Sequence, residues 1–489
     1  MKMTKLKVIP MPKEVIGEMA DGSFEYVGIS VAISADEYFL EAADTFAELV
    51  KKIHGAELES SKGGIALILD ASLASGEYRI EADENGARAF AADSEGISYA
   101  LSTLLQLASY DGGAIQLPKV KIFDKPDCGY RTFMVDLARQ WHSFDTLLGY
   151  VDLCYLYKIK YLHLHFIDTQ SYTLPSDKFP KMPTDGRHYS FEEIEKLNAY
   201  AASRGIELIP EVELPGHAKS MVSAYPELFA NTLEVEEFTD KYSLFNNNSK
   251  GNIICVGKEG MLDTVEELLR EVIAMFPNSK YIHIGGDEAT IAEWEVCTDC
   301  KRYMKKKRID GVKSLYSHFV KLVTDLVLSL GKTPIVWEGF PREGSEDISR
   351  DVLVIAWESY YNLAPDLVAD GFKIINASWK PLYIVPWSRW GGDPWCAKDV
   401  LEWNIYNWQN WNKKSPAHLN PINIQPTDSV LGAQLCAWEC TYEREIDEVR
   451  EKLAALSERT WNIRRYAEDE EFKEKLDAVL PIARALTAL

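Results

Sequence analysis

Apolar and polar positions recur along this chain with two periods, and the order of these periods predicts the fold. Beyond about residue 126, short apolar runs typical of buried strands are separated by stretches with helical spacing. We expect strands at residues 131–137, 161–166, 206–214, 281–284, 333–337, 352–357, 372–377 and 430–438. We expect helices at 145–157, 191–204, 261–275, 312–330 and 447–461. This alternation predicts an α/β fold with a (β/α)8 TIM barrel, and a doubly wound open sheet is the alternative.

The first part of the chain has a shorter pattern. Strand-like runs alternate there with amphipathic helical stretches at 36–54 and 96–108. The segment Leu117–Pro126 carries two prolines, which favours a linker. The sequence therefore predicts a smaller α/β domain at 1–126, the barrel at 127–465 with a tryptophan-rich insertion at 380–428, and a C-terminal helical tail at 466–489.

Composition and charge narrow the classes of partner. Of the 489 residues, 46% are hydrophobic and 26% are charged, which is typical of a globular protein and excludes a disordered chain. The formal net charge of −22 disfavours binding to nucleic acid or to an anionic membrane surface. No stretch of about 18 apolar residues is present, so we expect no membrane insertion. Residues 1–10 lack the apolar core of a signal peptide, and we therefore expect a cytoplasmic location.

We predict neither a cofactor nor a metal. No Gly-x-Gly-x-x-Gly motif opens a turn between a strand and a helix, so the usual dinucleotide signal is absent. Among the 8 cysteines, only Cys297 and Cys300 have suggestive spacing, and no second such pair follows at the distance typical of zinc fingers. Three interpretations of this pair stay open: a zinc site, a local disulfide or redox pair, and two plain thiols.

Polar and indole side chains gather where the predicted barrel strands end. Catalytic groups of such barrels come from the carboxyl ends of the strands. The first four strands end near Asp136 and Arg139, then His163, His165 and Asp168, then Glu211, Glu213 and His217, then Asp287 and Glu288. The last four end in Trp337, Trp357, Trp379 and Trp438. Indole faces opposite acids describe a pocket that suits a sugar ring. The N-terminal part has no such cluster, so we expect it to be non-catalytic.

The sharpest local motif is Gly285-Gly-Asp-Glu288 at the end of the fourth strand. Paired acids favour glycoside hydrolysis, in which one carboxylic acid protonates the leaving oxygen. Consecutive residues of an extended strand point to opposite faces, so Asp287 and Glu288 cannot easily act as acid and nucleophile on one bond. The second carboxylate must then do something else, such as orienting a nucleophile that the substrate carries. A solvated Asp-Glu turn is the alternative without function.

Six segments extend this pattern in order along the chain. They are Arg131-Thr-Phe-Met-Val-Asp136, His163-Leu-His-Phe-Ile-Asp168, Pro210-Glu-Val-Glu-Leu-Pro-Gly-His217, Gly285-Gly-Asp-Glu288, Val336-Trp337 and residues 432–438. Together they resemble the catalytic barrel of the family 20 glycoside hydrolases, the β-N-acetylhexosaminidases, over about residues 126–462. Residues 1–125 resemble the α/β domain that commonly precedes this barrel. The resemblance implies hydrolysis with retention, through an oxazolinium intermediate formed by the 2-acetamido group of the substrate and without metal or cofactor.

The resemblance also implies a role for each matching residue. Glu288 matches the general acid/base, Asp287 the residue that orients the acetamido group, and Asp168 and His217 the pair that supports the acid/base. The residues expected to bind substrate are Arg131, Trp337, Trp357, Tyr383, Trp438 and Glu439. Glu439 directly follows Trp438, whereas the family usually has one residue between these two positions. The preference between gluco and galacto epimers is therefore left open.

The predicted function is that of an exo-acting β-N-acetylhexosaminidase on a terminal β-linked GlcNAc or GalNAc of a small glycan or glycoconjugate. The alternatives are a narrower relative, acting on a disaccharide unit or a modified hexosamine, and a non-catalytic sugar-binding protein. The insertion at 380–428 is interpreted either as a lid over the pocket or as a subdomain that packs its own aromatic residues. The sequence does not decide the oligomeric state, and a homo-oligomer stays open.

Overall fold

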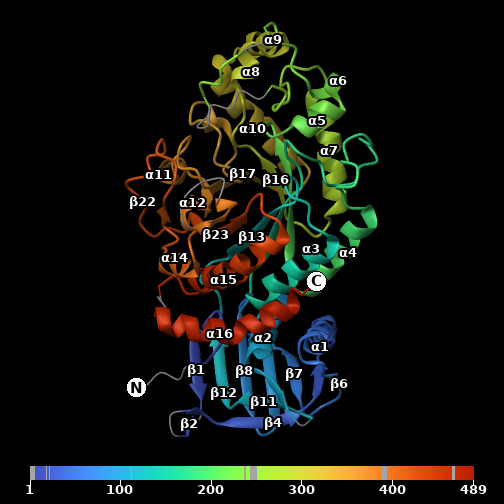
Figure 1. Ribbon diagram of the computed structural model, residues 1–489, viewed down its shortest axis with the longest axis vertical. Helices are drawn as coiled ribbons and strands as arrows, with labels where there is room; N and C mark the ends of the chain where they lie inside the picture. The colour runs from blue at the N-terminus through green and yellow to red at the C-terminus, as the bar shows by residue number, and fades with distance from the viewer. Residues whose placement is uncertain are drawn as a thin grey trace.

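The N-terminal domain is built on a mixed sheet. The computed structural model describes residues 6–17, 19–20, 23–111, 113–235, 238–242, 250–387, 394–464 and 468–488. In this part of the chain the first domain, drawn in blue, lies at one end of a larger barrel (Figure 1). Its strands are β1 (Glu14–Gly17), β2 (Met19–Ala20), β3 (Ser23–Phe24), β4 (Tyr26–Ser30), β5 (Ala32–Ala35), β6 (Glu59–Ser60), β7 (Ile65–Leu69), β8 (Tyr78–Asp83), β9 (Gly86–Ala91), β10 (Ser109–Asp111), β11 (Ala114–Pro118) and β12 (Val120–Asp124). Its helices are η1 (Glu37–Phe39), α1 (Leu40–His54) and α2 (Ser94–Leu107). The larger sheet has the order β1-β12-β8-β9-β7-β5-β6.

Strand β12 contradicts the linker predicted for Leu117–Pro126. It pairs antiparallel with both β1 and β8, and Ile122 at its centre is fully buried. Pro118 is the last residue of β11, and Pro126 follows β12. The prolines therefore stand at strand ends, where the missing N–H group does not interrupt a ladder of hydrogen bonds.

The second part of the chain is a closed parallel barrel. Its strands are β13 (Tyr130–Asp136), β14 (Tyr161–His165), β15 (Glu207–Leu214), β16 (Tyr281–Gly285), β17 (Thr333–Trp337), β18 (Leu353–Ala356), β19 (Lys373–Asn376) and β23 (Val430–Ala437). β13 pairs in parallel with both β14 and β23, which closes the sheet. The short β20 (Tyr383–Ile384) adds to β23 near its carboxyl end. The predicted (β/α)8 barrel is confirmed, and the open-sheet alternative is wrong because β13 is not an edge strand.

Helices follow the strands around the outside of the barrel. They are α3 (Phe144–Leu156), α4 (Phe191–Ser203), α5 (Lys219–Ala224), α6 (Pro226–Phe229), α7 (Met261–Met275), α8 (Ala292–Glu295), α9 (Thr298–Lys307), α10 (Gly311–Ser329), η2 (Ser345–Asp347), α11 (Ala364–Ala369), α12 (Trp379–Leu382), α14 (Ala397–Glu402), α15 (Tyr442–Trp461) and α16 (Asp469–Leu486). The insertion also carries the hairpin of β21 (Asn407–Trp408) and β22 (Ile422–Asn423). Ser190 and Glu193 form a capping box that fixes the start of α4. Among the described residues, no helix is both long enough and apolar enough to cross a membrane.

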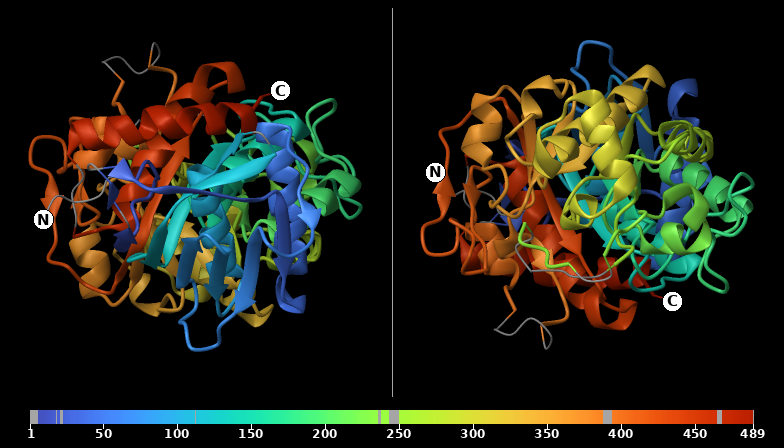
Figure 2. Two further views of the ribbon diagram at one scale, coloured as in Figure 1. Left: turned by 90° about the horizontal axis from the view of Figure 1, so that it is seen from below. Right: turned by 90° about the horizontal axis from the view of Figure 1, so that it is seen from above.

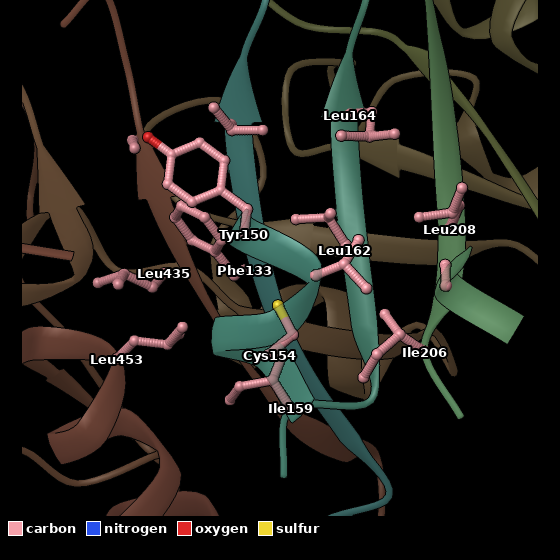
Figure 3. Packing of buried hydrophobic residues seen from close by; sticks show 14 of the residues in the cluster. Phe133, Tyr150, Cys154, Ile159, Leu162, Leu164, Ile206, Leu208, Leu435 and Leu453 are labelled. Carbon is pink, nitrogen blue, oxygen red and sulfur yellow. The ribbon is translucent and has the colours of Figure 1, made fainter. Parts of the chain in front are cut away.

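The layer between strands and helices supplies the main core. Figure 3 shows Phe133 of β13 and Leu162 of β14 facing Tyr150 and Cys154 of α3. The rings of Phe133 and Tyr150 meet edge to face with centroids 5.2 Å apart. Each such buried side chain stabilises the fold by roughly 1.5–3 kcal/mol. This packing therefore fixes the positions of the strands, and with them the positions of the polar residues at their carboxyl ends.

The amino ends of the barrel strands rest on the first domain. Lys158, between α3 and β14, donates from Nζ to the Tyr78 hydroxyl of β8 at 2.8 Å. Trp461 at the end of α15 donates from Nε1 to Asp124 of β12 at 2.9 Å. Helix α16, in red, lies between the two parts and contacts α1, α3 and α15 (Figure 1). The carboxyl ends point away, toward the connections that carry α5, α6, α8 and α9 at the opposite end of the molecule (Figure 2, right).

Candidate active site

Most barrel strands contribute a side chain to one site at their carboxyl ends. Asp168 follows β14, His217 follows β15, Asp287 and Glu288 follow β16, Trp337 ends β17, Trp357 follows β18, Tyr383 begins β20, and Trp438 and Glu439 follow β23. All of these side chains are buried except those of Glu288, Trp438 and Glu439, which are partly exposed. The site is therefore a largely desolvated pocket with a few accessible polar groups.

Three of the predicted site residues adopt left-handed backbone conformations. The φ angle is 49° at His217, 42° at Glu288 and 57° at Glu439. Such a conformation costs about 1–3 kcal/mol for a residue other than glycine and is concentrated at functional sites. Gly285 provides the space for this turn at β16, because a Cβ atom there would lie 2.1 Å from Glu213 Oε1. The Gly-Gly-Asp-Glu motif thus meets a steric need as well as a chemical one.

A chain of charged hydrogen-bonding groups leads to Glu288. His217 Nε2 lies 3.3 Å from Glu288 Oε2, and His217 Nδ1 lies 3.3 Å from Asp168 Oδ1. Arg139 Nη2 pairs with Asp168 Oδ2 at 2.7 Å. The structure therefore brings Asp168, His217 and Glu288 together, and the role in acid/base support that the resemblance implies for them stays a prediction.

The environment sets the charges along this chain. Burial alone would raise the pKa of Asp168, but Arg139 and His217 outweigh it and hold that pKa well below its ordinary value. Burial alone would lower the pKa of His217, but Asp168 and Glu288 outweigh it and hold that pKa well above its ordinary value. His217 is therefore an imidazolium with an N–H directed at Glu288 and another at Asp168.

Asp287 forms a carboxyl pair with Glu213. Burial raises the pKa of Asp287 to about 7, with Glu288 and Glu211 adding to the rise and His217 and a hydrogen bond with Glu213 opposing it. Burial and the neighbouring Asp287 raise the pKa of Glu213 well above its ordinary value. The hydrogen bond between Asp287 and Glu213 requires a proton on one of the two carboxyl groups.

Aromatic rings wall the space beside Asp287. The Trp357 and Tyr383 rings are stacked with centroids 6.1 Å apart. Trp337 lies 5.8 Å from Trp438 and 6.3 Å from Trp357 by the same measure. The buried hydroxyl of Tyr383 interacts with the Trp438 side chain, and this contact lacks good hydrogen-bond geometry. The four rings thus form one aromatic cluster at the carboxyl end of the barrel, and such a cluster suits a small amide or a sugar face.

A buried carboxylate, Glu211, organises the floor of the site, and the sequence pattern gave it no role. His163 Nε2, at 3.1 Å, and His283 Nδ1, at 3.0 Å, lie next to it, and His165 bonds it through Nδ1. Burial would raise the pKa of Glu211, but these histidines outweigh it and hold it well below its ordinary value. Trp337 Nε1 also donates to Glu211. The Pro210-Glu-Val-Glu segment predicted acidic groups at the end of this strand. It could not predict the histidines that contact Glu211, because they belong to other strands.

Two further buried acids lie behind the pocket. Glu338 accepts hydrogen bonds from consecutive backbone N–H groups, from Glu358 to Asn362, and so fixes the turn after β18. Neither carboxyl oxygen of Glu358 has a hydrogen-bond partner in the described structure. Burial raises the pKa of Glu358 well above its ordinary value, and Glu288 adds to this. Burial therefore favours the protonated form of Glu358, which interacts electrostatically with Glu288.

Arg131 lies outside the site, which contradicts its predicted contact with the sugar. It stands near the amino end of β13 and is fully buried. Its guanidinium donates to the carbonyl oxygens of Cys128 and Lys158 and to the Tyr99 hydroxyl of α2. Arg139, beyond the carboxyl end of the same strand, lies in the site instead, with its guanidinium carbon 4.9 Å from the Trp438 ring centroid. The position along β13 decides which arginine lies in the site, because the amino end of this strand faces the N-terminal domain and its carboxyl end faces the site.

The tryptophan-rich insertion packs on the barrel. Trp408 is fully buried and donates from Nε1 to the carbonyl oxygen of Ala356 in β18. Trp395 and Trp411 contact Trp379, which stacks on Tyr383 with centroids 4.7 Å apart. The insertion therefore supports the wall of the pocket from behind, and the lid interpretation stays a prediction. Trp390 lies outside the described residues.

Several groups of metal-ligand type occur among the described residues. Three belong to the site: His163 with Glu211 and His283, His165 with Glu211 and Glu213, and His217 with Asp287 and Glu288. Their members already contact one another through the interactions above. The fourth group, Cys255 with Cys297 and Cys300, lies outside the pocket.

Comparisons with known proteins match both parts of the chain. A family model described as glycosyl hydrolase family 20, catalytic domain, matches residues 128–464, and one described as glycosyl hydrolase family 20, domain 2, matches residues 5–125. A β-hexosaminidase of Porphyromonas gingivalis is 26% identical over 508 residues, covering 96% of this chain and 62% of the relative. A β-hexosaminidase of Vibrio furnissii is 27% identical over 394 residues, covering 76% and 62%. The chain thus spans 62% of the length of each of these relatives.

Solved structures share the fold. A family 20 exo-β-N-acetylglucosaminidase from Vibrio harveyi, in complex with N-acetylglucosamine, superposes with a TM-score of 0.82. The superposition covers 98% of this chain and 77% of that chain, at 22% sequence identity. At this identity the likeness concerns the arrangement of both domains, and the chemistry has to be argued from the side chains.

Proposed function

Because the chain belongs to glycosyl hydrolase family 20, we propose that it is an exo-acting, retaining β-N-acetylhexosaminidase. Its substrate would be a terminal β-linked GlcNAc or GalNAc of a small glycan or glycoconjugate. The observation that carries the proposal is the placement of Asp287 beside an aromatic pocket, one residue from Glu288 with its link to His217 and Asp168. The cytoplasmic location and the oligomeric state stay predictions.

In the first step, the substrate supplies its own nucleophile. The acetamido group enters the space between Trp337, Trp357 and Tyr383, where its N–H donates to the Asp287 carboxylate and its carbonyl oxygen accepts from the Tyr383 hydroxyl. That oxygen attacks C1 while Glu288 protonates the glycosidic oxygen, so the C1–O bond to the aglycone breaks as the new C1–O bond forms. Ionised Asp287 stabilises the positive charge that develops on the acetamido nitrogen.

In the second step, water opens the oxazolinium ring. Glu288, now a carboxylate, removes a proton from the water as its oxygen attacks C1 from the face that the aglycone left. The bond from C1 to the acetamido oxygen breaks, and the β-configured sugar is released. Protonated His217 donates to Glu288, which positions the carboxyl group for both steps.

We propose that Arg139, and not Arg131, binds the hydroxyl groups of the sugar. It lies beside the Trp438 ring, whose face would cover one side of the pyranose. Its partner Asp168 fixes its position, and Glu439 contributes a negative charge nearby. A planar guanidinium can donate to two vicinal hydroxyl groups at once. The epimer preference would then depend on how Arg139 and Glu439 share the 4-hydroxyl group.

Side-by-side hydrolysis of the p-nitrophenyl β-glycosides of GlcNAc, GalNAc and glucose tests the proposal. We expect release from the two hexosaminides and none from the glucoside, because only the hexosaminides carry the nucleophile. The ratio between the first two gives the epimer preference. Folded protein that hydrolyses the glucoside as well would contradict the substrate-assisted step. No hydrolysis of any of the three would favour a narrower substrate or a non-catalytic sugar-binding protein.

A further inference from the structure

Three cysteines from two separate connections converge outside the catalytic pocket. Cys297 and Cys300 lie at the start of α9, and Cys255 lies 42 residues before Cys297 in the connection between β15 and α7. The Cys255 Sγ lies 3.6 Å from the Sγ of Cys297 and 3.6 Å from that of Cys300. All three side chains are fully buried. Cys297 and Cys300, the pair with suggestive spacing, therefore have Cys255 as a third neighbour, which the spacing alone does not predict.

The sulfur separations distinguish between two kinds of bond. A disulfide requires about 2.05 Å between its sulfurs. A tetrahedral zinc site with Zn–S bonds of about 2.3 Å places its sulfurs about 3.8 Å apart. The observed 3.6 Å corresponds to the edge of such a tetrahedron, and one sulfur, that of Cys255, lies at this distance from both others.

An oxygen donor stands beside one of the three sulfurs. Asn231 Oδ1 lies 3.6 Å from the Cys300 Sγ. The Asn231 Nδ2 donates to the Ile253 carbonyl oxygen and to Glu293 Oε1, both at 3.0 Å, so the amide is held with its oxygen toward Cys300. With a Zn–O bond of about 2.1 Å, an oxygen ligand lies about 3.6 Å from each sulfur ligand of the same ion. Asn231 thus provides the fourth donor that the Cys-x-x-Cys spacing lacked.

We propose that Cys255, Cys297 and Cys300 form a structural zinc site, with the Asn231 carbonyl oxygen in the fourth position. Binding of Zn²⁺ by three thiols releases three protons, so the site would carry a net charge of −1 and its affinity would rise with pH. A closed coordination sphere and full burial are typical of structural zinc, whereas a catalytic zinc keeps an open position.

The consequence is a cross-link between two connections that border the active site. One connection carries His217 and Cys255, and the other carries Glu288, Cys297 and Cys300. Backbone hydrogen bonds already join the two segments, from Glu234 N to the Val296 carbonyl and from Thr298 N to the Thr232 carbonyl. Zinc at this place would fix their relative position, and with it the approach of His217 to Glu288. The zinc site does not depend on the proposed hydrolase activity.

Metal analysis of the full-length protein tests the site. Protein purified from zinc-containing medium without chelator is expected to hold about one zinc ion per chain. Cys255→Ser, Cys297→Ser and Cys300→Ser should each reduce the zinc content at least tenfold. Cys154→Ala, which changes a fully buried cysteine in α3, is the matched control and should keep its zinc. Loss of zinc from the control as well would overturn the assignment to these three residues.

A second measurement needs no variant. Replacement of zinc by Co²⁺ in the wild-type protein should give a thiolate-to-cobalt charge-transfer band and the intense visible bands of a tetrahedral site. Removal of the metal by a chelator should lower the Tm, and added zinc should restore it. Folded wild-type protein that takes up neither metal, with all three thiols titratable after reduction and denaturation, would overturn the proposal. A disulfide between any two of these cysteines in non-reduced protein would do the same.

Discussion

His217 Nε2 lies 3.3 Å from Glu288 Oε2, and both residues hold left-handed backbone conformations at the ends of neighbouring strands. The contact makes Glu288 the end of a chain that runs through His217 to Asp168 and Arg139. Charges alternate from Arg139 through Asp168 to His217, so each of these three groups stabilises the ionised form of the next. The proposed acid/base is thus held by a preorganised network.

Replacement of Glu288 by glutamine should separate catalysis from binding. An amide cannot donate a proton to the leaving oxygen, so we expect kcat to fall at least about 100-fold on a substrate with a poor leaving group. The loss should be smaller for the p-nitrophenyl glycoside, which departs without full protonation. Glu346→Gln, at an exposed position in η2, is the control. Unchanged turnover of the poor substrate by Glu288→Gln would contradict the assignment.

Arg131 and Arg139 form a matched pair, because both belong to the segment around β13 and differ in the end at which they stand. Arg131→Lys removes the fork that binds Cys128, Lys158 and Tyr99, and it should destabilise the protein by about 2–4 kcal/mol with KM unchanged. Arg139→Lys should raise KM at least about tenfold with a smaller change in Tm. Thermal unfolding and steady-state kinetics on both variants check this. The reverse pattern would return the sugar contact to Arg131.

Tyr383→Phe should lower activity without lowering stability. The hydroxyl is buried and its contact with Trp438 lacks good hydrogen-bond geometry, so its removal relieves a poorly satisfied polar group. In the proposed complex the same hydroxyl bonds the acetamido oxygen, and we expect kcat/KM to fall about 10-fold to 100-fold. Kinetics and Tm measured on one preparation give both quantities. A fall in Tm with unchanged kcat/KM would show that the hydroxyl has a structural role only.

The raised pKa of Asp287 should make the stability of the ligand-free protein depend on pH. The folded protein keeps this proton up to a pKa of about 7, whereas the unfolded chain loses it near the ordinary value of 3.8. The native state therefore binds more protons between these values, so the contribution of Asp287 to stability is present below about pH 4 and is lost as the pH rises through 7. We expect Asp287→Asn to raise the Tm over the wild type at pH 8 and to lose this advantage at pH 4. Equal Tm differences at the two pH values would contradict the raised pKa.

The same group should shape the pH dependence of activity. Charge stabilisation of the acetamido nitrogen requires ionised Asp287, so kcat/KM should rise with pH until the carboxylate has formed near pH 7. The residual activity of Asp287→Asn should lack this acid limb. A thiazoline mimic of the intermediate should lose more affinity than substrate in this variant. An acid limb that persists in Asp287→Asn would assign it to another group.

Much of this fold was predictable because its signals are local. Continuous apolar runs such as Leu353–Ala356 are typical of strands in a sheet covered on both faces, and their alternation with helical stretches leaves few topologies. The Gly285-Gly-Asp-Glu288 motif was equally visible, because glycine is required where the chain passes Glu213. The segment at Val120–Asp124 was misjudged because two nearby prolines outweighed a short strand whose partners lie far away along the chain.

The sequence by itself determined the barrel, the order of its strands and the identity of the two consecutive acids, since periodicity and motif are properties of neighbouring residues. Only the tertiary structure decided which arginine of the β13 segment faces the pocket, which histidines surround Glu211, and that Cys255 joins Cys297 and Cys300. These contacts join strand ends and loops that are distant in sequence. Their partners are set by strand direction and barrel closure, which act on the whole chain at once.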